Sequence, residues 1–129
     1  MKLLLDTHVW IWLLTDPNRL SRPAYAALVA ADNQLYLSPA STWECSVKFT
    51  AGRLDLDGSP EALLQEAIVA SGVLPLPIEH SHALQTARLP AHHRDPFDRM
   101  LIAQAQVERM TLVSADEQLT RYDVGILWS

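Results

Sequence analysis

Short apolar runs alternate with helical segments along this chain of 129 residues, and that alternation limits the folds that the chain can adopt. Short apolar runs that are bounded by turn signals are typical of strands buried on both faces of a sheet. Strands that alternate with helices predict an α/β domain with a parallel sheet. The expected strands are Lys2–Leu5, Gln34–Leu37, Val73–Leu76, Thr111–Ser114 and, at an edge of the sheet, Val124–Trp128.

The helices expected between these strands carry start and stop signals. Ser21, Ser38 and Ser59 each stand one or two residues before a proline, which is typical of an N-cap followed by a first helical turn. Gly72 and Gly52 stand where two of these helices should end. The expected helices cover residues 8–14, 23–31, 39–50, 61–71, 80–89, 97–109 and 117–122.

Length and composition narrow the class of protein. The length predicts a single domain over residues 1–129, and a hydrophobic content of 49% is ample for a buried core. A membrane span is not expected, since no long uncharged apolar segment occurs. The N-terminal apolar run is interrupted by Asp6 and His8, so we interpret it as a strand and a helix rather than a signal peptide, and expect a cytoplasmic protein.

The net charge argues against one class of function, and the single cysteine limits the possible cross-links. The formal charge of −5 argues against a passive nucleic-acid coat, because phosphate contacts need basic residues. It remains compatible with a nuclease whose metal ions meet the phosphate, or with a protein that binds a basic partner. The single cysteine, Cys45, excludes an internal disulfide and is expected to be a buried, inert thiol.

Four acidic residues stand beside the apolar segments, and they indicate a site. Asp6 ends the first strand and Asp116 follows the fourth, so both should lie where the carboxyl ends of parallel strands form a crevice. Glu44 lies in the helix after the second strand, and Asp98 opens the helix before the fourth. Buried carboxylates need compensation, and no matching set of lysines or arginines accompanies them. The expected partner is therefore a divalent metal ion.

Each acid also has a purely structural interpretation. Glu44 could form an ion pair with Lys48, four residues later on the same helix, although Lys48 could instead face RNA phosphate. Asp98 could simply favour the start of its helix through the helix dipole. Asp116 could be a helix N-cap, and this role is compatible with metal binding.

Four segments together resemble the PIN-domain nucleases, and among them the VapC-type toxins of bacterial type II toxin–antitoxin pairs. These segments are LLLDTHVWIWLL, SPASTWECSVKFTAGRL, RDPFDRMLIAQA and LVSADEQLTRYDV, and the resemblance covers nearly the whole chain. It implies an α/β, three-layer PIN-like fold with a central four- or five-stranded parallel sheet flanked by helices. It also implies a metal-dependent endoribonuclease, using Mg²⁺ or Mn²⁺, that cleaves RNA such as tRNA or rRNA. The implied protein partners are a cognate VapB-type antitoxin and a second copy of the chain.

The resemblance also implies roles for individual residues. The four acids of the family, catalytic residues and metal ligands, map onto Asp6, Glu44, Asp98 and Asp116. Asp6 and Asp98 are the best candidates for direct metal contact, and Glu44 for orienting a water molecule. Thr7 and Ser114 match small polar positions near the first and fourth acids, where they could hydrogen-bond carboxylates or substrate. Asp95 is an additional acid that many close relatives share.

The histidines are expected to be structural. His92 and His93 are neighbours in a polar loop, where a zinc site is conceivable, but adjacent histidines point in different directions. We interpret them as surface-loop residues. His80 and His82 are expected on a helix surface. His8 follows Asp6 closely and could face the site, but a partly buried position in a helix is the favoured interpretation.

Other residues are candidates for contacts with RNA or protein. Arg53, Arg94 and Arg99 could contact phosphate, with a salt bridge to Asp98 as the alternative role of Arg99. Trp12 and nearby apolar residues could form a patch for a protein partner.

Two other functions compete with a nuclease. An inactive PIN-like module that only binds a partner is one alternative, and the presence of all four acids argues against it. A phosphotransfer enzyme is the other, but His8 stands where its second Asp would be expected.

Overall fold

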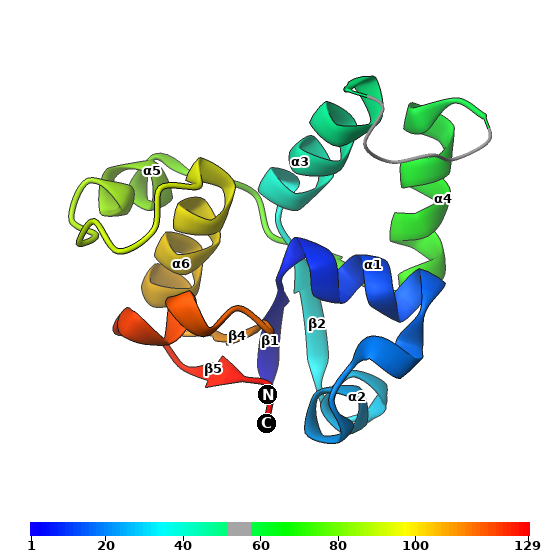
Figure 1. Cartoon of the computed structure of the whole chain (residues 1–129), viewed down its shortest axis with the longest axis horizontal. Helices are drawn as coiled ribbons and strands as arrows, with labels where there is room; N and C mark the ends of the chain where they lie inside the picture. The colour runs from blue at the N-terminus through cyan, green and yellow to red at the C-terminus, as the bar shows by residue number, and fades with distance from the viewer. Residues whose placement is uncertain (52–57) are drawn as a thin grey trace.

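A five-stranded parallel sheet runs through the computed structural model, which describes residues 1–51 and 58–129 (Figure 1). Its strands are β1 (Lys2–Leu5), β2 (Gln34–Leu37), β3 (Leu74–Pro75), β4 (Thr111–Val113) and β5 (Ile126–Leu127), in the order β3-β2-β1-β4-β5. β1 pairs with β2 on one side and with β4 on the other. The chain therefore crosses from one half of the sheet to the other beside β1, and ligands of open α/β sheets bind at such a switch point.

Six α-helices and two short 3₁₀ helices, η1 and η2, join the strands in the described residues (Figure 1). The α-helices are α1 (Thr7–Thr15), α2 (Arg22–Val29), α3 (Pro39–Thr50), α4 (Pro60–Ser71), α5 (His80–Thr86) and α6 (Pro96–Glu108), and the 3₁₀ helices are η1 (Pro17–Arg19) and η2 (Glu117–Arg121).

Three of the five expected start and stop signals act as predicted. The Ser21 and Ser38 side chains accept hydrogen bonds from the first turns of α2 and α3, whereas the Ser59 side chain makes no such bond. Gly72 ends α4 in the left-handed conformation, with φ of 67°. The expected end of α3 at Gly52 lies outside the described residues.

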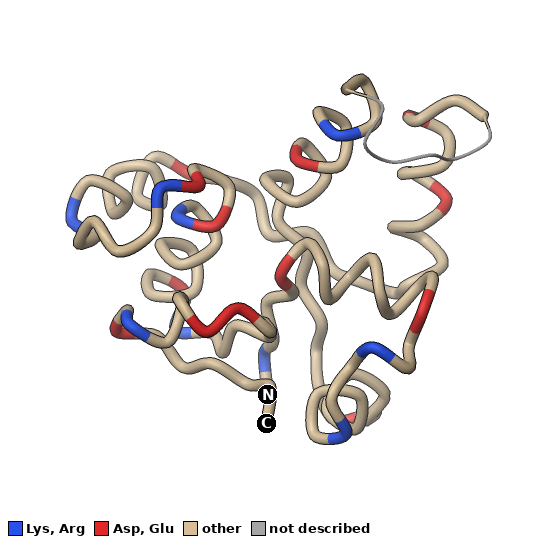
Figure 2. The backbone as a smooth tube through the Cα atoms, in the orientation of Figure 1, with Lys and Arg blue, Asp and Glu red and all other residues tan. Residues whose placement is uncertain are grey.

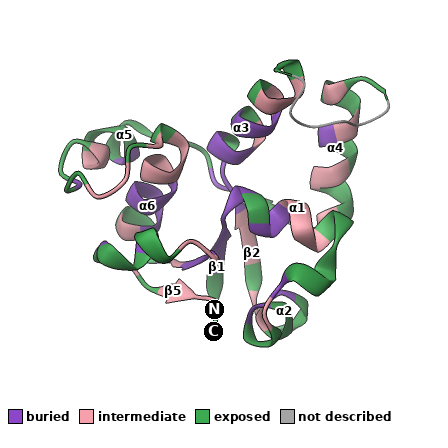
Figure 3. Cartoon of the chain, in the orientation of Figure 1, coloured by how far each residue is buried: buried purple, intermediate pink, exposed green. Residues whose placement is uncertain are grey.

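The alternation of side chains along β1 divides the core into two layers. Leu3 and Leu5 pack against α1, α2 and α4, whereas Leu4 packs on the opposite face with α6. All three are fully buried, and much of β1 is coloured as buried in Figure 3. Burial of one leucine contributes about 1.5–3 kcal/mol. Cys45 of α3 lies in the first of these layers, and burial raises the pKa of its thiol to about 11, as expected for an inert thiol.

The packing of α5 on α6 corrects the expectation for His82. Its side chain is buried, not on the helix surface. Its Nδ1 accepts a hydrogen bond from the backbone N–H of Glu79, and its Nε2 lies 2.9 Å from Oε1 of Glu108. His82 therefore links the start of α5 to the end of α6. Within the described residues, no helix combines the length and apolarity that a membrane crossing requires.

Candidate active site

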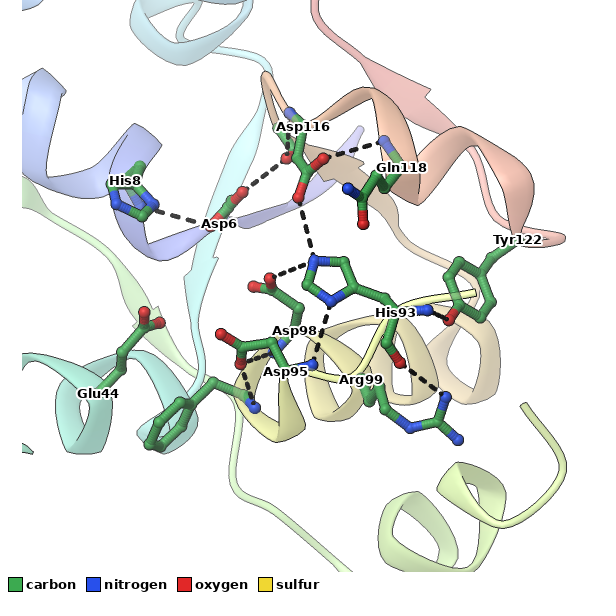
Figure 4. A network of polar contacts seen from close by, with 12 residues as sticks. Asp6, His8, Glu44, His93, Asp95, Asp98, Arg99, Asp116, Gln118 and Tyr122 are labelled. Atoms are coloured by element: carbon green, nitrogen blue, oxygen red, sulfur yellow. Dashed lines mark hydrogen bonds and ion pairs between the residues drawn. The ribbon is translucent and has the colours of Figure 1, made fainter. Parts of the chain in front are cut away.

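Acidic residues from four separate segments gather near the carboxyl ends of β1 and β4 (Figure 2), and Figure 4 shows their side chains. Asp6 follows β1 directly, and Asp116 stands at the start of η2 after β4. Asp98 belongs to the first turn of α6, and Glu44 to the middle of α3. The carboxylates of Asp6, Asp95, Glu44 and Asp116 all lie close enough to Asp98 to raise its pKa. The fold thus brings together the four acids that the sequence singles out.

Burial and mutual repulsion make this cluster unfavourable when every carboxylate is charged. Desolvation by burial, followed by the neighbouring carboxylates, raises the pKa of Asp98 to about 8. Burial also raises the pKa of Asp6, which is only 5% exposed, although hydrogen bonds from Ser114 and His8 oppose the shift. A cation placed among these groups would stabilise their charged forms.

The donor atoms fit a hard divalent cation. Mg²⁺ and Mn²⁺ prefer carboxylate and water oxygens, and the cluster offers carboxylate oxygens from several elements. Glu44 supplies a further observation, because its Oε1 atom is buried and has no hydrogen-bond partner among the described residues. Its other oxygen lies 2.9 Å from Nζ of Lys48, so the expected helical ion pair is present. A buried, unpaired carboxylate oxygen needs a partner, and a metal ion or its water would provide one.

Two small polar residues hold the site in different ways. Ser114 Oγ donates to Asp6 Oδ2 at 2.6 Å and accepts from the backbone N–H of Asp116 at 3.1 Å, so it joins two of the acids. Thr7 Oγ1 instead donates to Ser41 Oγ at 3.0 Å and joins α1 to α3. The expected contact with a carboxylate is therefore found for Ser114, whereas Thr7 contacts Ser41 in this structure. A contact of Thr7 with substrate stays a prediction.

Asp95 and Asp116 both cap helices. The carboxylate of Asp95 accepts hydrogen bonds from the backbone N–H groups of Phe97 and Asp98, at 2.8 and 3.2 Å. These bonds fix the first turn of α6, which carries Asp98. Asp116 accepts from the backbone N–H of Gln118 at 2.9 Å, so its expected N-cap role is confirmed.

His93 lies inside the acidic cluster, and its interpretation as a surface-loop residue is wrong (Figure 4). Its Nε2 lies 3.1 Å from Asp98 Oδ2 and 3.2 Å from Asp116 Oδ2. The backbone N–H of His93 donates to the Tyr122 hydroxyl at 2.8 Å, which fixes the loop beside the site. The contact of His93 with Asp116 joins segments that are far apart in the sequence. The sequence gives one sign of it, namely that His93 stands close to Asp95 and Asp98.

The hydrogen bonds of the His93 ring define its role in this structure. One possible metal-ligand atom from each of His93, Asp98 and Asp116 lies within 4.8 Å of the other two, which is compatible with a metal site. However, Nδ1 accepts a hydrogen bond from the backbone N–H of Asp95 at 3.1 Å. An imidazole nitrogen that accepts carries no proton, so the ring proton is on Nε2. The Nε2–H of His93 therefore donates to Asp116 and lies at ion-pair distance from Asp98, so the ring bridges the two carboxylates.

The structure corrects one of the three arginine candidates, Arg99, and leaves the other two as predictions. The Arg99 guanidinium donates to the backbone carbonyls of Thr86, Leu89, Pro90 and His93, at 3.0–3.3 Å. It therefore fixes the loop before α6, and it neither pairs with Asp98 nor is free to bind phosphate. Arg94 is exposed, and Arg53 lies outside the described residues.

Three of the four acids face a surface groove of about 380 Å³. Asp6, Asp98 and Asp116 line one part of it, and Ala115 and residues of the first helical region line the rest: His8, Trp12 and Arg19. His8 is exposed, contrary to the expectation of partial burial. A groove of this kind can admit a substrate strand to the carboxylates.

Comparison with known proteins finds solved structures that share the fold of this chain. The VapBC2 complex of Rickettsia felis bound to a promoter DNA fragment is 15% identical, covers 100% of both chains and has a TM-score of 0.72. VapBC-5 of Mycobacterium tuberculosis is 18% identical, with coverage of 99% and 98% and a TM-score of 0.64. FitAcB of Neisseria gonorrhoeae is 20% identical, with coverage of 97% and 96% and a TM-score of 0.61.

At these identities the likeness shows a shared fold. No curated protein matches the sequence significantly. The family model of the PIN domain matches residues 3–125. Because that match leaves out only the two ends of the sequence, the chain belongs to the PIN domain nuclease family.

Proposed function

We propose that this protein is a Mg²⁺- or Mn²⁺-dependent endoribonuclease that acts as the toxin of a toxin–antitoxin pair. The observation that carries this proposal is the convergence of Asp6, Glu44, Asp98 and Asp116 on one region of a PIN fold. The surface groove supports it as well, because three of these acids line it.

The residues divide the chemistry between them. Asp6 and Asp98 would hold the cation, with Asp116 completing the site and Glu44 orienting a water molecule through its unpaired Oε1. When bound, a divalent cation would make water a stronger nucleophile and offset charge on the phosphoryl oxygens. The oriented water attacks the phosphorus atom, and the bond from phosphorus to one ester oxygen breaks. The attacking water gives up one proton and the departing oxygen takes up one, so the products are a phosphate end and a hydroxyl end.

The proposed protein partner is a VapB-type antitoxin. Similar structures are described as members of the VapBC family of toxin-antitoxin systems and as a toxin-antitoxin complex from Klebsiella pneumoniae. The acidic charge of −5 favours a partner with a basic binding segment. A homodimer and a cytoplasmic location belong to the same proposal.

The proposal is tested with an Asp6→Asn variant and an Asp32→Asn control, which removes one acidic charge at an exposed position outside the groove lining. Both proteins are incubated with tRNA and rRNA in Mg²⁺, Mn²⁺ or EDTA, and the cut ends are mapped. We expect Asp6→Asn to lower the cleavage rate on the order of 10²–10³-fold, Asp32→Asn to cleave normally, and EDTA to stop cleavage. Circular dichroism checks that both variants fold. Failure of the parent to cleave RNA, or equal cleavage by the two variants, would contradict the proposal.

A further inference from the structure

The groove that holds the acids extends onto an aromatic and basic edge. Asp98 and Asp116 line the same groove as Trp12 and Arg19. The centre of the Arg19 guanidinium lies 4.6 Å from the centroid of the Trp12 ring, within the range of a cation–π interaction. A positive group is thus held beside a strongly acidic site.

Local structure places Arg19 over this ring. The backbone N–H of Asp16 donates to the Trp12 carbonyl at 2.8 Å, and that of Arg19 donates to the Asp16 carbonyl at 3.1 Å. These bonds end α1 and form η1, so the chain turns back beside α1. Buried Leu20 anchors the segment immediately afterwards. The position of Arg19 therefore follows from well-defined backbone structure.

Neighbouring aromatic rings also restrain Trp12. Its ring lies 5.9 Å from the His8 ring and 6.0 Å from the Trp128 ring, both in tilted geometry. The Trp12 ring, expected to contribute to a partner-binding patch, is here in contact with these groups and with Arg19. A guanidinium held on a restrained ring loses less conformational freedom when it binds an anion.

The charge of Arg19 is available for a ligand. Its side chain is exposed, and it forms no ion pair with a carboxylate among residues 1–51 and 58–129, although three acids line the same groove. An RNA strand that approaches these acids brings several phosphates, of which a metal site can neutralise only those beside it. A guanidinium matches the oxygens of a phosphate and can bind two of them at once.

We propose that Arg19, oriented by Trp12, is a substrate-binding residue that contacts an RNA phosphate next to the cleaved one. This inference rests on the proposed ribonuclease function. Arg19 is not among the phosphate contacts that the sequence suggested, which were Arg53, Arg94 and Arg99.

The test compares Arg19→Ala with Arg88→Ala, which removes the same charge from an exposed position outside the groove lining. The substrate is a labelled tRNA that the parent protein cleaves, and kcat and KM are measured separately. We expect Arg19→Ala to raise KM about tenfold or more, as for loss of a hydrogen-bonded charge, with a small change in kcat. Arg88→Ala should keep the parent KM, Arg19→Lys should recover part of the loss, and Trp12→Leu should lie between the parent and Arg19→Ala.

A second measurement separates binding from catalysis. Binding of the same tRNA to the Asp6→Asn protein is followed by fluorescence anisotropy at several salt concentrations. Adding Arg19→Ala should weaken binding and reduce the slope of log K against log salt by about one, whereas adding Arg88→Ala should not.

Three outcomes would overturn the inference while leaving the ribonuclease intact. One is equal KM for Arg19→Ala and Arg88→Ala. Another is that Arg19→Ala binds RNA less well only because it is less thermally stable, and that Arg19→Lys does not recover the binding. Arg19 would then have only a structural role, joining η1 to α1. The third is an effect of Arg19→Ala confined to binding of a protein partner. Absence of RNA cleavage and binding by the parent protein would instead reject the proposed function.

Discussion

Single side chains hold the carboxylates of this site in place. Ser114 bonds Asp6 and the backbone of Asp116, and the His93 ring donates to Asp116 and lies at ion-pair distance from Asp98. Groups that orient metal-binding residues commonly affect metal affinity about 10–100-fold. His93 is therefore expected to act as a positioning residue for the metal site.

Replacement of His93 tests this role. Metal-free His93→Ala should bind Mn²⁺ about 10–100-fold more weakly than the parent, because Asp98 and Asp116 lose the ring that bridges them. His93→Gln should recover part of the affinity through its amide N–H. Isothermal titration calorimetry measures the affinities, with His80→Ala as an exposed histidine control. Unchanged Mn²⁺ affinity in His93→Ala would exclude the positioning role.

At the scale of elements, helix ends determine where the acids lie. Asp95 caps α6, and Asp98 then occupies the first turn of that helix. Ser38 caps α3, whose middle carries Glu44. The ends of β1 and β4 supply the other two acids, so each carboxylate depends on a regular element for its position.

Two substitutions distinguish a helix-capping role of Asp95 from a metal-binding role. Asp95→Ala should lower the free energy of unfolding by about 1 kcal/mol, because α6 loses its N-cap. Asp95→Asn should retain most of that stability, since asparagine is also a good N-cap, and should cleave RNA far better than Asp98→Asn. Chemical denaturation and cleavage rates provide the measurements. If Asp95→Asn were as inactive as Asp98→Asn, Asp95 would have to be counted among the metal ligands.

At the scale of the whole molecule, the raised pKa of Asp98 means that deprotonation of the acidic site opposes folding, and a bound cation should offset that cost. The pKa of Asp98 is about 8 in the folded protein, against an ordinary value of 3.8. Between these pH values the folded state binds more protons at this group than the unfolded state does. The contribution of Asp98 to the free energy of unfolding therefore decreases as pH rises from about 4 to about 8.

This linkage predicts that rising pH lowers the stability of the metal-free protein but increases the stabilisation that a bound metal ion provides. In EDTA, the parent should lose stability relative to Asp98→Asn as pH rises from about 5 to 8. A divalent cation at about one hundred times its dissociation constant should stabilise the parent by about 2.7 kcal/mol, more clearly at pH 8 than at pH 5, because protons compete for the same oxygens. Thermal melting across pH measures both effects. An Asp98→Asn protein with the same pH dependence as the parent in EDTA would contradict the assignment.

Much of the fold and the main acids could be predicted from sequence because they depend on short-range patterns. Apolar runs define the strands, and serine–proline pairs and glycines mark helix ends. The strands at the edges proved shorter than expected, and α5 ends at Thr86 instead of residue 89, because pairing and packing, not composition alone, set these limits. Asp6 and Asp116 could be placed together because parallel strands end at a common edge.

The sequence by itself therefore determined the α/β architecture and the meeting of Asp6, Glu44, Asp98 and Asp116. Only the tertiary structure decided which other side chains join them. His93 faces two acids, Arg99 is occupied by backbone carbonyls, and Arg19 lies on Trp12. These arrangements depend on the paths of loops and on contacts between side chains, and local patterns of residue type do not specify either.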